Sequence, residues 1–246
     1  MLDGIEVGAT FGAGTGAVSV YDPSDDFNSS VMKLWVDASI VDYKTSTYQD
    51  YFIMNGSQVS AWQDRSGNNN HIVQSTASLQ PTTSSLSGKR IMNTDGTNYM
   101  DFTNSITGVR FIAAAFTKTA ISNKNFLVYG AATTYYAAGL ASTPDKDIGR
   151  AGNATVGSGS FNISGSVWRV GFYNYDGTNL TIYQNNIAGN SIVGGGTPLT
   201  FSKFLYNTTN TYYLNGGVAE MIMLTTNPTT GQRSSIYNYL SRKWSI

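Results

Sequence analysis

The sequence predicts an all-β protein, an antiparallel two-layer sandwich that ends in one short helix. Three observations support this: short runs rich in aromatic and β-branched residues, Asx-Gly pairs around them, and one helical pattern near the C-terminus. A parallel α/β sheet would need helical segments between its strands, and none are evident. At 246 residues the chain fits a single large β domain.

The strand pattern is clearest in five runs, at 33–37, 110–116, 125–129, 167–173 and 180–183. Tight hairpins need residues with positive φ, which Asx-Gly pairs supply. Such pairs are found at Asn55-Gly56, Asp95-Gly96, Asp176-Gly177 and Asn215-Gly216. We therefore expect strands joined by tight turns over most of the chain.

The segment 228–244 is the exception, because its apolar residues follow a helical period. Ile236, Leu240 and Trp244 recur at i, i+4 and i+8. Asn227 is suited to cap such a helix, and Pro228 suits its first turn. We expect this helix to pack on one face or edge of the sandwich.

Residues 1–32 differ from the rest, with glycines scattered among small residues. They predict an extended arm before the domain at 33–246, either loose or docked on a neighbouring subunit. Asp3 and Glu6 occur where a signal peptide would have basic residues, which predicts that none is present. No run approaches about 20 apolar residues, so we expect no membrane insertion.

Charge is sparse in this sequence. Charged residues make up 12% of it and the net charge is zero, whereas about 25% charged residues is ordinary. A nucleic-acid-binding protein would show a basic patch or a high pI, so this class is excluded. We expect a surface of Ser, Thr, Asn, Gln and Gly.

Several motifs together resemble the LamG-like jelly-roll domains, which are concanavalin A-like lectin/glucanase modules of bacteriophage virion and bacterial surface proteins. The motifs are LWVDA at 34–38, WQDRSGNNNH at 62–71, DGTNYM at 95–100 and GVAEMIML at 217–224, then Tyr239-Leu240 and Lys243-Trp244. The resemblance covers 33–246 and implies a two-sheet jelly roll. This fold carries lectins, glycosidases, adhesins and structural modules, so it implies no single activity.

Catalytic chemistry finds little support in the residues. Retaining glycosidases need two carboxylates about 5 Å apart, and enzymes of this superfamily carry them as E-x-D-x-E on one strand. The only glutamates here are Glu6 and Glu220, and Glu220 has no acidic partner at i+2 or i+4. With no cysteine, His71 as the only histidine and no G-x-S-x-G motif, we predict that the protein is not an enzyme.

The resemblance places Glu220 on a late strand beside the terminal helix. There it implies a structural carboxylate that bonds backbone amides or pairs with Arg242 or Lys243.

Calcium is the metal that the residues allow. Asp64 and Asn68 alternate with other residues around Gly67, as in an oxygen-ligand loop. An EF-hand would need glycine at the sixth position and glutamate at the twelfth, where Asn69 and Ser75 stand. The resemblance still leaves a calcium site at Asp64 and Asn68, and the alternative is that these side chains bond their own turn. We expect no other cofactor.

Two tyrosine doublets are the candidate ligand-binding residues. Adjacent residues on a strand point to opposite faces, so one ring of each doublet can face solvent and serve as a platform for a sugar. The doublets are Tyr135-Tyr136 and Tyr212-Tyr213. We expect the four tryptophans in the core.

Two functions remain open at this point. The first is a bacteriophage virion structural protein, a capsid decoration protein, head fibre or tail adhesin, in which residues 1–32 bind other virion proteins. Its knob could bind a host-surface glycan and form a homo-oligomer. The alternative is a carbohydrate-binding module of a secreted or cell-surface bacterial protein. The small size, Gly-rich arm and low charge favour the virion.

Overall fold

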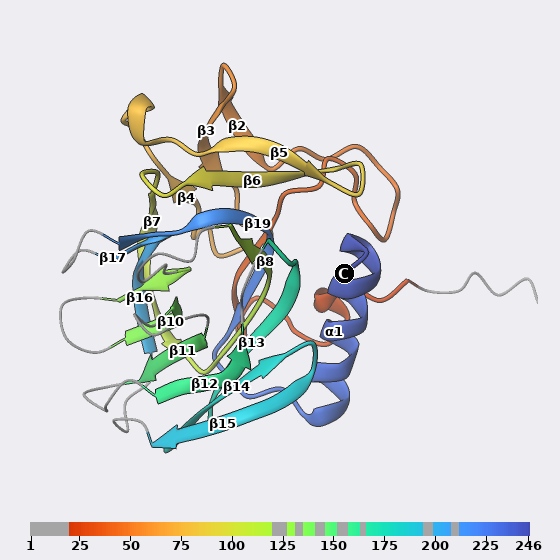
Figure 1. Ribbon diagram of the computed structural model, residues 1–246. Helices are drawn as coiled ribbons and strands as arrows, with labels where there is room; N and C mark the ends of the chain where they lie inside the picture. The colour runs from red at the N-terminus through yellow and green to blue at the C-terminus, as the bar shows by residue number, and fades with distance from the viewer. Residues whose placement is uncertain are drawn as a thin grey trace, which may run out of the picture.

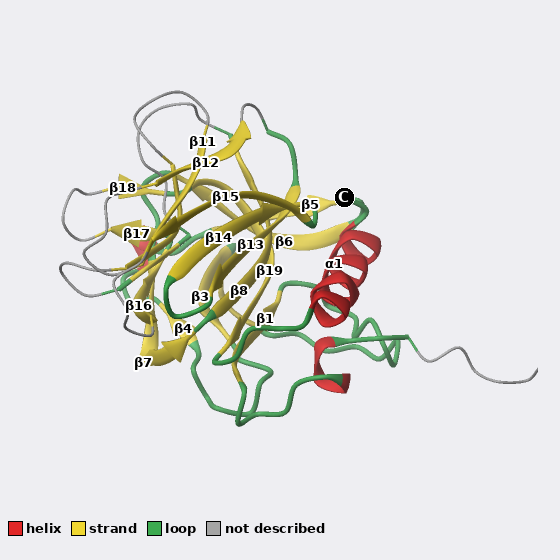
Figure 2. Ribbon diagram, turned by 90° about the horizontal axis from the view of Figure 1, so that it is seen from below, coloured by secondary structure: helices red, strands yellow, loops and turns green. Residues whose placement is uncertain are grey.

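The structure is a computed structural model that describes residues 20–119, 127–130, 135–140, 146–151, 157–162, 166–193, 199–207 and 212–246. Antiparallel strands form one continuous hydrogen-bonded network that curls into two layers, and one helix lies at the C-terminus (Figures 1 and 2). The predicted all-β jelly-roll sandwich with a short C-terminal helix is confirmed.

The first layer is centred on β19, which pairs with β8 along one side and with β1 and β6 along the other. It contains β1 (Met32–Asp37), β5 (Thr82–Leu86), β6 (Lys89–Asp95), β8 (Phe111–Lys118), β13 (Arg169–Tyr175), β14 (Asn179–Gln184), β15 (Ile187–Val193) and β19 (Asn215–Leu224).

The second layer runs from a hairpin through β4, β7 and β16 to further strands. It contains β2 (Phe52–Asn55), β3 (Gln58–Trp62), β4 (Ile72–Val73), β7 (Met100–Val109), β9 (Val128–Tyr129), β10 (Tyr135–Leu140), β11 (Lys146–Ala151), β12 (Gly157–Asn162) and β16 (Leu199–Phe204). β5 also pairs with β3, which joins the two layers.

The shorter elements lie outside these layers. They are η1 (Pro23–Asp25), η2 (Ala77–Leu79) and the pair β17 (Tyr206–Asn207) with β18 (Tyr212–Tyr213).

The centre of the first layer is covered on both of its faces. Every residue of β8 is buried, and so is every residue of β19 after Asn215. The second layer covers one face, and α1 (Thr230–Trp244) packs against β8 and β13 on the other. The sequences of these strands are therefore nearly continuous apolar runs. A strand with one face in solvent would alternate apolar and polar residues.

Helix α1 buries the predicted apolar residues Ile236, Leu240 and Trp244, and also Tyr239 and Lys243. The predicted start at 228 is two residues early and the predicted cap is wrong. Thr229 is the N-cap, since its hydroxyl accepts from the Gln232 amide while the Gln232 side chain accepts from the Thr229 amide. This reciprocal pair satisfies two amides that a cap at Asn227 would leave open.

Three of the four predicted Asx-Gly turns are present, with positive φ at Gly56, Gly96 and Gly177. The prediction of a turn at Asn215-Gly216 is wrong, because these residues lie inside β19. Glycine is needed there because a Cβ on Gly216 would lie 2.1 Å from the Thr117 carbonyl oxygen. The pair marks a close approach between strands and not a turn.

The segment before β1 is described from residue 20 onward, and residues 1–19 lie outside the described part. Phe27 is buried in the core, and the ring of Tyr21 packs edge-on against Tyr239 at 6.4 Å between centroids. The described portion of the predicted arm therefore packs on the domain.

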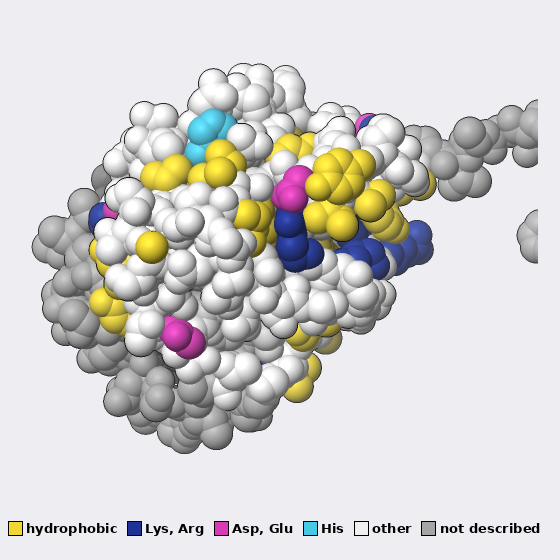
Figure 3. Space-filling view, turned by 90° about the horizontal axis from the view of Figure 1, so that it is seen from above, with side chains coloured by type: hydrophobic (Ala, Val, Ile, Leu, Met, Phe, Trp, Pro, Cys, Tyr) yellow, Lys and Arg dark blue, Asp and Glu magenta, His cyan; other side chains and the backbone are white. Residues whose placement is uncertain are grey.

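The surface agrees with the low charge of the sequence. On the face seen in Figure 3, charged side chains are few and most of the area is uncharged polar side chains and backbone. Among the described residues, no helix is both long and apolar enough to span a bilayer.

Candidate functional site

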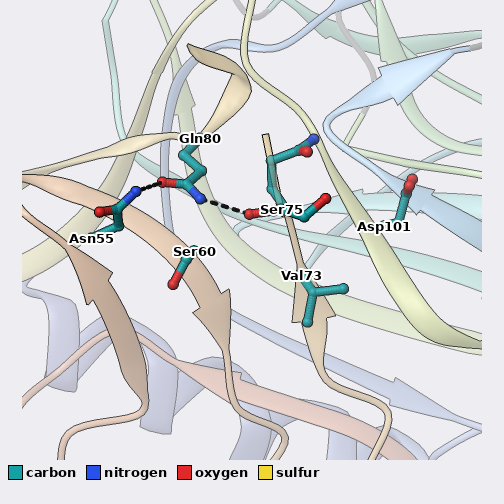
Figure 4. A pocket seen from close by; sticks show the side chains of 7 residues that line it. Asn55, Ser60, Val73, Ser75, Gln80 and Asp101 are labelled. Carbon is teal, nitrogen blue, oxygen red and sulfur yellow. Dashed lines mark hydrogen bonds between the residues drawn. The ribbon is translucent and has the colours of Figure 1, made fainter. Parts of the chain in front are cut away.

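An open cleft of about 430 Å³ lies over the second layer, where the β2–β3 hairpin, β4 and the start of β7 meet the segment before β5. Figure 4 shows its lining side chains, which are mostly amides and hydroxyls: Asn55, Ser60, Val73, Gln74, Ser75, Gln80 and Asp101. We call it the polar cleft. Its lining offers hydrogen-bond donors and acceptors with little charge.

Gln80 organises one wall of the polar cleft. Its Oε1 accepts a hydrogen bond from Asn55 Nδ2 at 3.1 Å, and its Nε2 donates to the Gln74 carbonyl oxygen at 2.7 Å (Figure 4). Only 2% of Gln80 is exposed. The buried Gln80 amide therefore fixes the orientation of the more exposed Asn55 side chain. Because Asn55 Nδ2 is bound to Gln80, the orientation of Asn55 Oδ1 is fixed as well.

A second glutamine links the polar cleft to a pair of aromatic rings. Gln74 Nε2 donates to the Tyr99 carbonyl oxygen at 3.0 Å, and Gln74 Oε1 accepts from the Thr76 amide at 3.0 Å. The Tyr99 ring lies 6.0 Å from the Tyr213 ring, with 36° between their planes. Both tyrosines are half-buried, and the contact of Gln74 with this pair is to the Tyr99 backbone.

Asp101 is the only carboxylate among the described residues that line the cleft, and it is paired. Lys203 Nζ donates to Asp101 Oδ1 at 2.6 Å from the directly opposite position on β16. The side chains are 28% and 41% exposed, respectively. Ser60 Oγ donates to the Ile53 carbonyl oxygen at 2.9 Å. The described lining therefore offers mainly hydrogen-bonding groups.

The predicted tyrosine doublets are placed only in part. Tyr213 is the member whose side chain is described, and it stacks with Tyr99 as above. The side chains of Tyr135, Tyr136 and Tyr212 lie outside the described residues. By register, Tyr136 stands opposite Tyr129, which itself stands opposite Lys203.

The loop proposed for calcium is closed by its own hydrogen bonds. Asp64 Oδ1 accepts from the amides of Trp35 and Ser66, both at 2.9 Å, and Oδ2 accepts from the Ser66 hydroxyl and the Asn70 amide. Asn68 Nδ2 donates to the Met32 carbonyl oxygen at 2.7 Å. These bonds tie the loop to β1. Among the described residues, no three His, Cys, Asp or Glu side chains converge as for a metal.

A second concentration of polar groups lies beneath α1 and is sealed from solvent. Glu220 accepts from the Trp35 indole at 2.7 Å and from the Tyr239 hydroxyl at 2.7 Å, both on Oε1. Its Oε2 accepts from the Trp244 indole at 2.9 Å and pairs with Lys243 Nζ at 2.8 Å. The predicted structural role of Glu220 thus appears as an ion pair with Lys243, with indole and phenol donors in place of backbone amides.

Asp37 and Arg65 extend this sealed group. Asp37 Oδ2 pairs with Lys243 Nζ at 2.6 Å and with Arg65 Nη1 at 2.5 Å. Arg65 also pairs with Asp42 and lies over the Trp35 ring, 4.0 Å from its centroid. We call Asp37, Glu220, Tyr239 and Lys243 the buried cluster. Each is at most 3% exposed.

Burial controls the protonation of the buried cluster. It raises the pKa of Glu220, because a carboxylate loses its hydration there, and the charge of Lys243 opposes this shift only in part. Burial also raises the pKa of Tyr239, and the nearby charges of Glu220 and Asp37 add to the effect. Tyr239 therefore stays protonated, and its hydroxyl donates a hydrogen bond to Glu220.

No protein-family model matches the chain, and no curated protein matches it. Several solved structures are similar to the chain in fold. Domain 4 of AbnA, a GH43 extracellular arabinanase from Geobacillus stearothermophilus in complex with arabinotriose, aligns with a TM-score of 0.51 and 10% identity, covering 85% of this chain and 98% of that one. A GH54 α-L-arabinofuranosidase aligns with a TM-score of 0.59 and 12% identity, covering 88% and 64%.

Trypanosoma rangeli sialidase in complex with the inhibitor DANA aligns with a TM-score of 0.55 and 11% identity, covering 93% of this chain and 36% of the sialidase. The chain thus spans about a third of the sialidase. At these identities the likeness shows the fold alone, a β-sandwich of the jelly-roll kind.

Proposed function

We propose that the protein is a carbohydrate-binding β-sandwich domain, and that the polar cleft is its binding site. The observation that carries the proposal is the rigid set of uncharged hydrogen-bonding groups, in which the buried Gln80 holds Asn55 at an open surface. Sugar hydroxyls both donate and accept, so they suit amide and hydroxyl side chains. Tyr99, whose carbonyl oxygen accepts from the cleft residue Gln74, brings its ring and that of Tyr213 into the same region.

The neighbours in fold support the same kind of ligand. The arabinanase domain was solved with arabinotriose, and it aligns over 98% of its length, so the likeness spans that entire domain. The sialidase was solved with sialic acid, and a further neighbour is the binding domain of Paraclostridial Mosquitocidal Protein 1, with a TM-score of 0.53. A neutral glycan suits this cleft best, because its one carboxylate is neutralised by Lys203.

We infer that binding takes place without hydrolysis. Glu220 has no exposed surface and Asp101 is held by Lys203, so neither is positioned as one of a pair of acid–base carboxylates at the cleft. This supports the prediction that the protein is not an enzyme. A hydrolysis assay on any glycan that binds is its test.

The narrower assignment to a LamG-like domain of a bacteriophage virion stays a prediction, as does a location in the virion, in secretions or on a cell surface. It predicts that residues 1–32 bind other virion proteins, and co-sedimentation with purified capsids or tails would test this. Calcium at Asp64 and Asn68 likewise stays a prediction, and calorimetric titration with calcium would measure it.

A glycan array on the full chain, followed by calorimetric titration of the best ligand, tests the proposed function. We expect binding that Asn55→Ala and Ser60→Ala weaken, while Asn104→Ala, an exposed residue elsewhere on β7, leaves it unchanged. No bound glycan, or equal affinity in all variants, would overturn the proposal that the polar cleft binds carbohydrate.

A further inference from the structure

The buried cluster places one amine, that of Lys243, in contact with two carboxyl groups, those of Asp37 and Glu220. Lys243 Nζ lies 2.6 Å from Asp37 Oδ2 and 2.8 Å from Glu220 Oε2. Asp37 on β1 and Glu220 on β19 stand directly opposite each other in the strand register. All three side chains are at most 1% exposed. Amine and carboxyl are thus held together in a site without bulk water.

We propose that Lys243 and Asp37 become joined by an intramolecular isopeptide bond, an amide between Nζ and the side-chain carboxyl carbon, with Glu220 carrying the protons. The reaction consumes one ammonium and one carboxylate and yields one amide and one water. Charge is conserved, and no oxidant, reductant or cofactor is needed.

The proton transfers follow from the contacts. Glu220 Oε2 takes a proton from the Lys243 ammonium, which leaves an amine with a free electron pair. Nζ attacks the Asp37 carboxyl carbon, forming the C–N bond and a tetrahedral centre. Glu220 then gives its proton to the departing Asp37 oxygen. A second proton passes from Nζ to the same oxygen. The C–O bond breaks with release of water.

The surroundings of Asp37 suit it to this reaction. Its Oδ1 accepts from the Ser39 amide at 3.0 Å and from the Ser39 hydroxyl at 2.7 Å, so two donors would stabilise negative charge on that oxygen in the tetrahedral centre. Arg65 donates to Oδ2, the atom that leaves. Reacting groups held within about 3–3.5 Å behave as at very high effective concentration.

The surroundings of Glu220 suit it to carry protons. The Trp35, Trp244 and Tyr239 donors fix both of its oxygens, so it cannot rotate away from Lys243. Burial raises its pKa, which makes it a better proton acceptor than an exposed carboxylate. A hollow of about 410 Å³, bordered by Ser39, Asp42 and Lys243, adjoins the cluster and offers the released water a path outward.

The bond would tie the first long strand to the last helix, across 206 positions of sequence. A covalent link that closes so long a loop restricts the unfolded chain strongly. In a domain that binds a surface glycan, it would also keep α1 attached when the chain is pulled. The Lys203–Asp101 pair is at the same 2.6 Å but exposed to water, and in the described part of the chain no second carboxylate pairs with Lys203, so it supplies an internal control.

Mass spectrometry of the intact, denatured full-length chain tests the proposal. We expect a mass about 18 Da below that of the sequence, the loss of one water. A tryptic digest should contain a branched peptide that joins residues 34–44 to residues 243–246. A mass equal to that of the sequence, both in fresh protein and after prolonged incubation, would overturn the proposal, and this measurement needs no variant.

Variants then assign the roles. Lys243→Arg and Glu220→Gln should both restore the full sequence mass, while Lys203→Arg should keep the deficit of one water. On a denaturing gel, the wild-type chain should migrate faster than Lys243→Arg, because a closed loop is more compact. A deficit that persists in Lys243→Arg would place the lost water elsewhere and overturn the assignment.

Discussion

The buried cluster and the polar cleft contain similar side chains in opposite environments. Each has a lysine–aspartate pair with 2.6 Å between nitrogen and oxygen, Lys243–Asp37 in the cluster and Lys203–Asp101 at the cleft. The first pair is 1% and 0% exposed, and the second is 28% and 41% exposed. The distance is the same, so the two pairs differ in their exposure to water and in the Glu220 and Arg65 side chains that also contact the buried pair.

This difference decides what each pair can do. Exposed ion pairs contribute about 0–1 kcal/mol, because water and salt screen them. Removing one member of a buried pair costs about 3–5 kcal/mol, because the remaining charge has no partner. We therefore expect the cluster to govern folding and the cleft to govern binding.

The largest effect should come from Glu220→Ala. It leaves Lys243 and three hydrogen-bond donors without this acceptor, so the free energy of unfolding should fall by about 3–5 kcal/mol. Urea unfolding followed by tryptophan fluorescence measures it. The control is Lys203→Ala, which should cost less than about 1 kcal/mol. Similar losses in both variants would remove the distinction between the two regions.

Tyr239→Phe tests the hydrogen bonds of the buried cluster without creating a large cavity. The hydroxyl donates to Glu220 and accepts from Lys243 at 2.9 Å, and hydrogen bonds to charged groups contribute about 1.5–3 kcal/mol. We expect a loss in that range in the same unfolding experiment. Tyr237→Phe, two residues away on α1, should be close to neutral, and an equal effect there would contradict this account.

Asn55→Ala tests the cleft side of the comparison. One lost hydrogen bond of about 0.5–1.5 kcal/mol should weaken glycan binding by up to about tenfold. The free energy of unfolding should fall by no more than about 1.5 kcal/mol, because the lost donor to Gln80 Oε1 stands at an exposed position that water can fill. Calorimetric titration and a melting curve give both values. A variant that melts much earlier would show that the cleft is structural.

The smallest effect concerns acid. Partial burial alone would raise the pKa of Asp42, but hydrogen bonds from Thr45 and the charge of Arg65 outweigh it, so the pKa lies below its usual value. A lowered pKa contributes stability above about pH 4 that is lost as the pH falls through the folded-state value. The Tm should therefore fall between about pH 5 and pH 2.

Asp42→Asn is the matched variant for the acid experiment. Its Tm should start lower and fall less steeply over the same range, because the asparagine cannot take up a proton. Identical pH profiles would show that Asp42 contributes nothing to acid sensitivity.

The fold was largely predictable, because strand periodicity, turn residues and the terminal apolar stripe are local signals. A structural role for Glu220 was also predicted, with backbone amides, Arg242 or Lys243 as its partners, and the structure selects Lys243. The turn at Asn215-Gly216 was not, because the reason for glycine there is the Thr117 carbonyl, which is distant in sequence. Similarly, the cap moved to Thr229 because Gln232 completes it.

The polar cleft could not be predicted. Asn55 on β2, Gln80 just before β5 and Asp101 on β7 are far apart in sequence, and each alone is an ordinary polar residue of a β protein. Nothing in the sequence around Gln74 and Gln80 indicates that their amides would frame a hollow. Only the packing of the β2–β3 hairpin beside β4 and β7 brings them together.

The sequence by itself determined a cysteine-free β-sandwich of low charge with a helix at its end, because periodicity and composition act locally along the chain. The tertiary structure decided which polar residues meet water. It buried Asp37, Glu220 and Lys243 between α1 and the sheet, and left Asn55 and Asp101 accessible to solvent. Whether a side chain is buried depends on which elements pack over it. For these residues, those elements are far away in sequence.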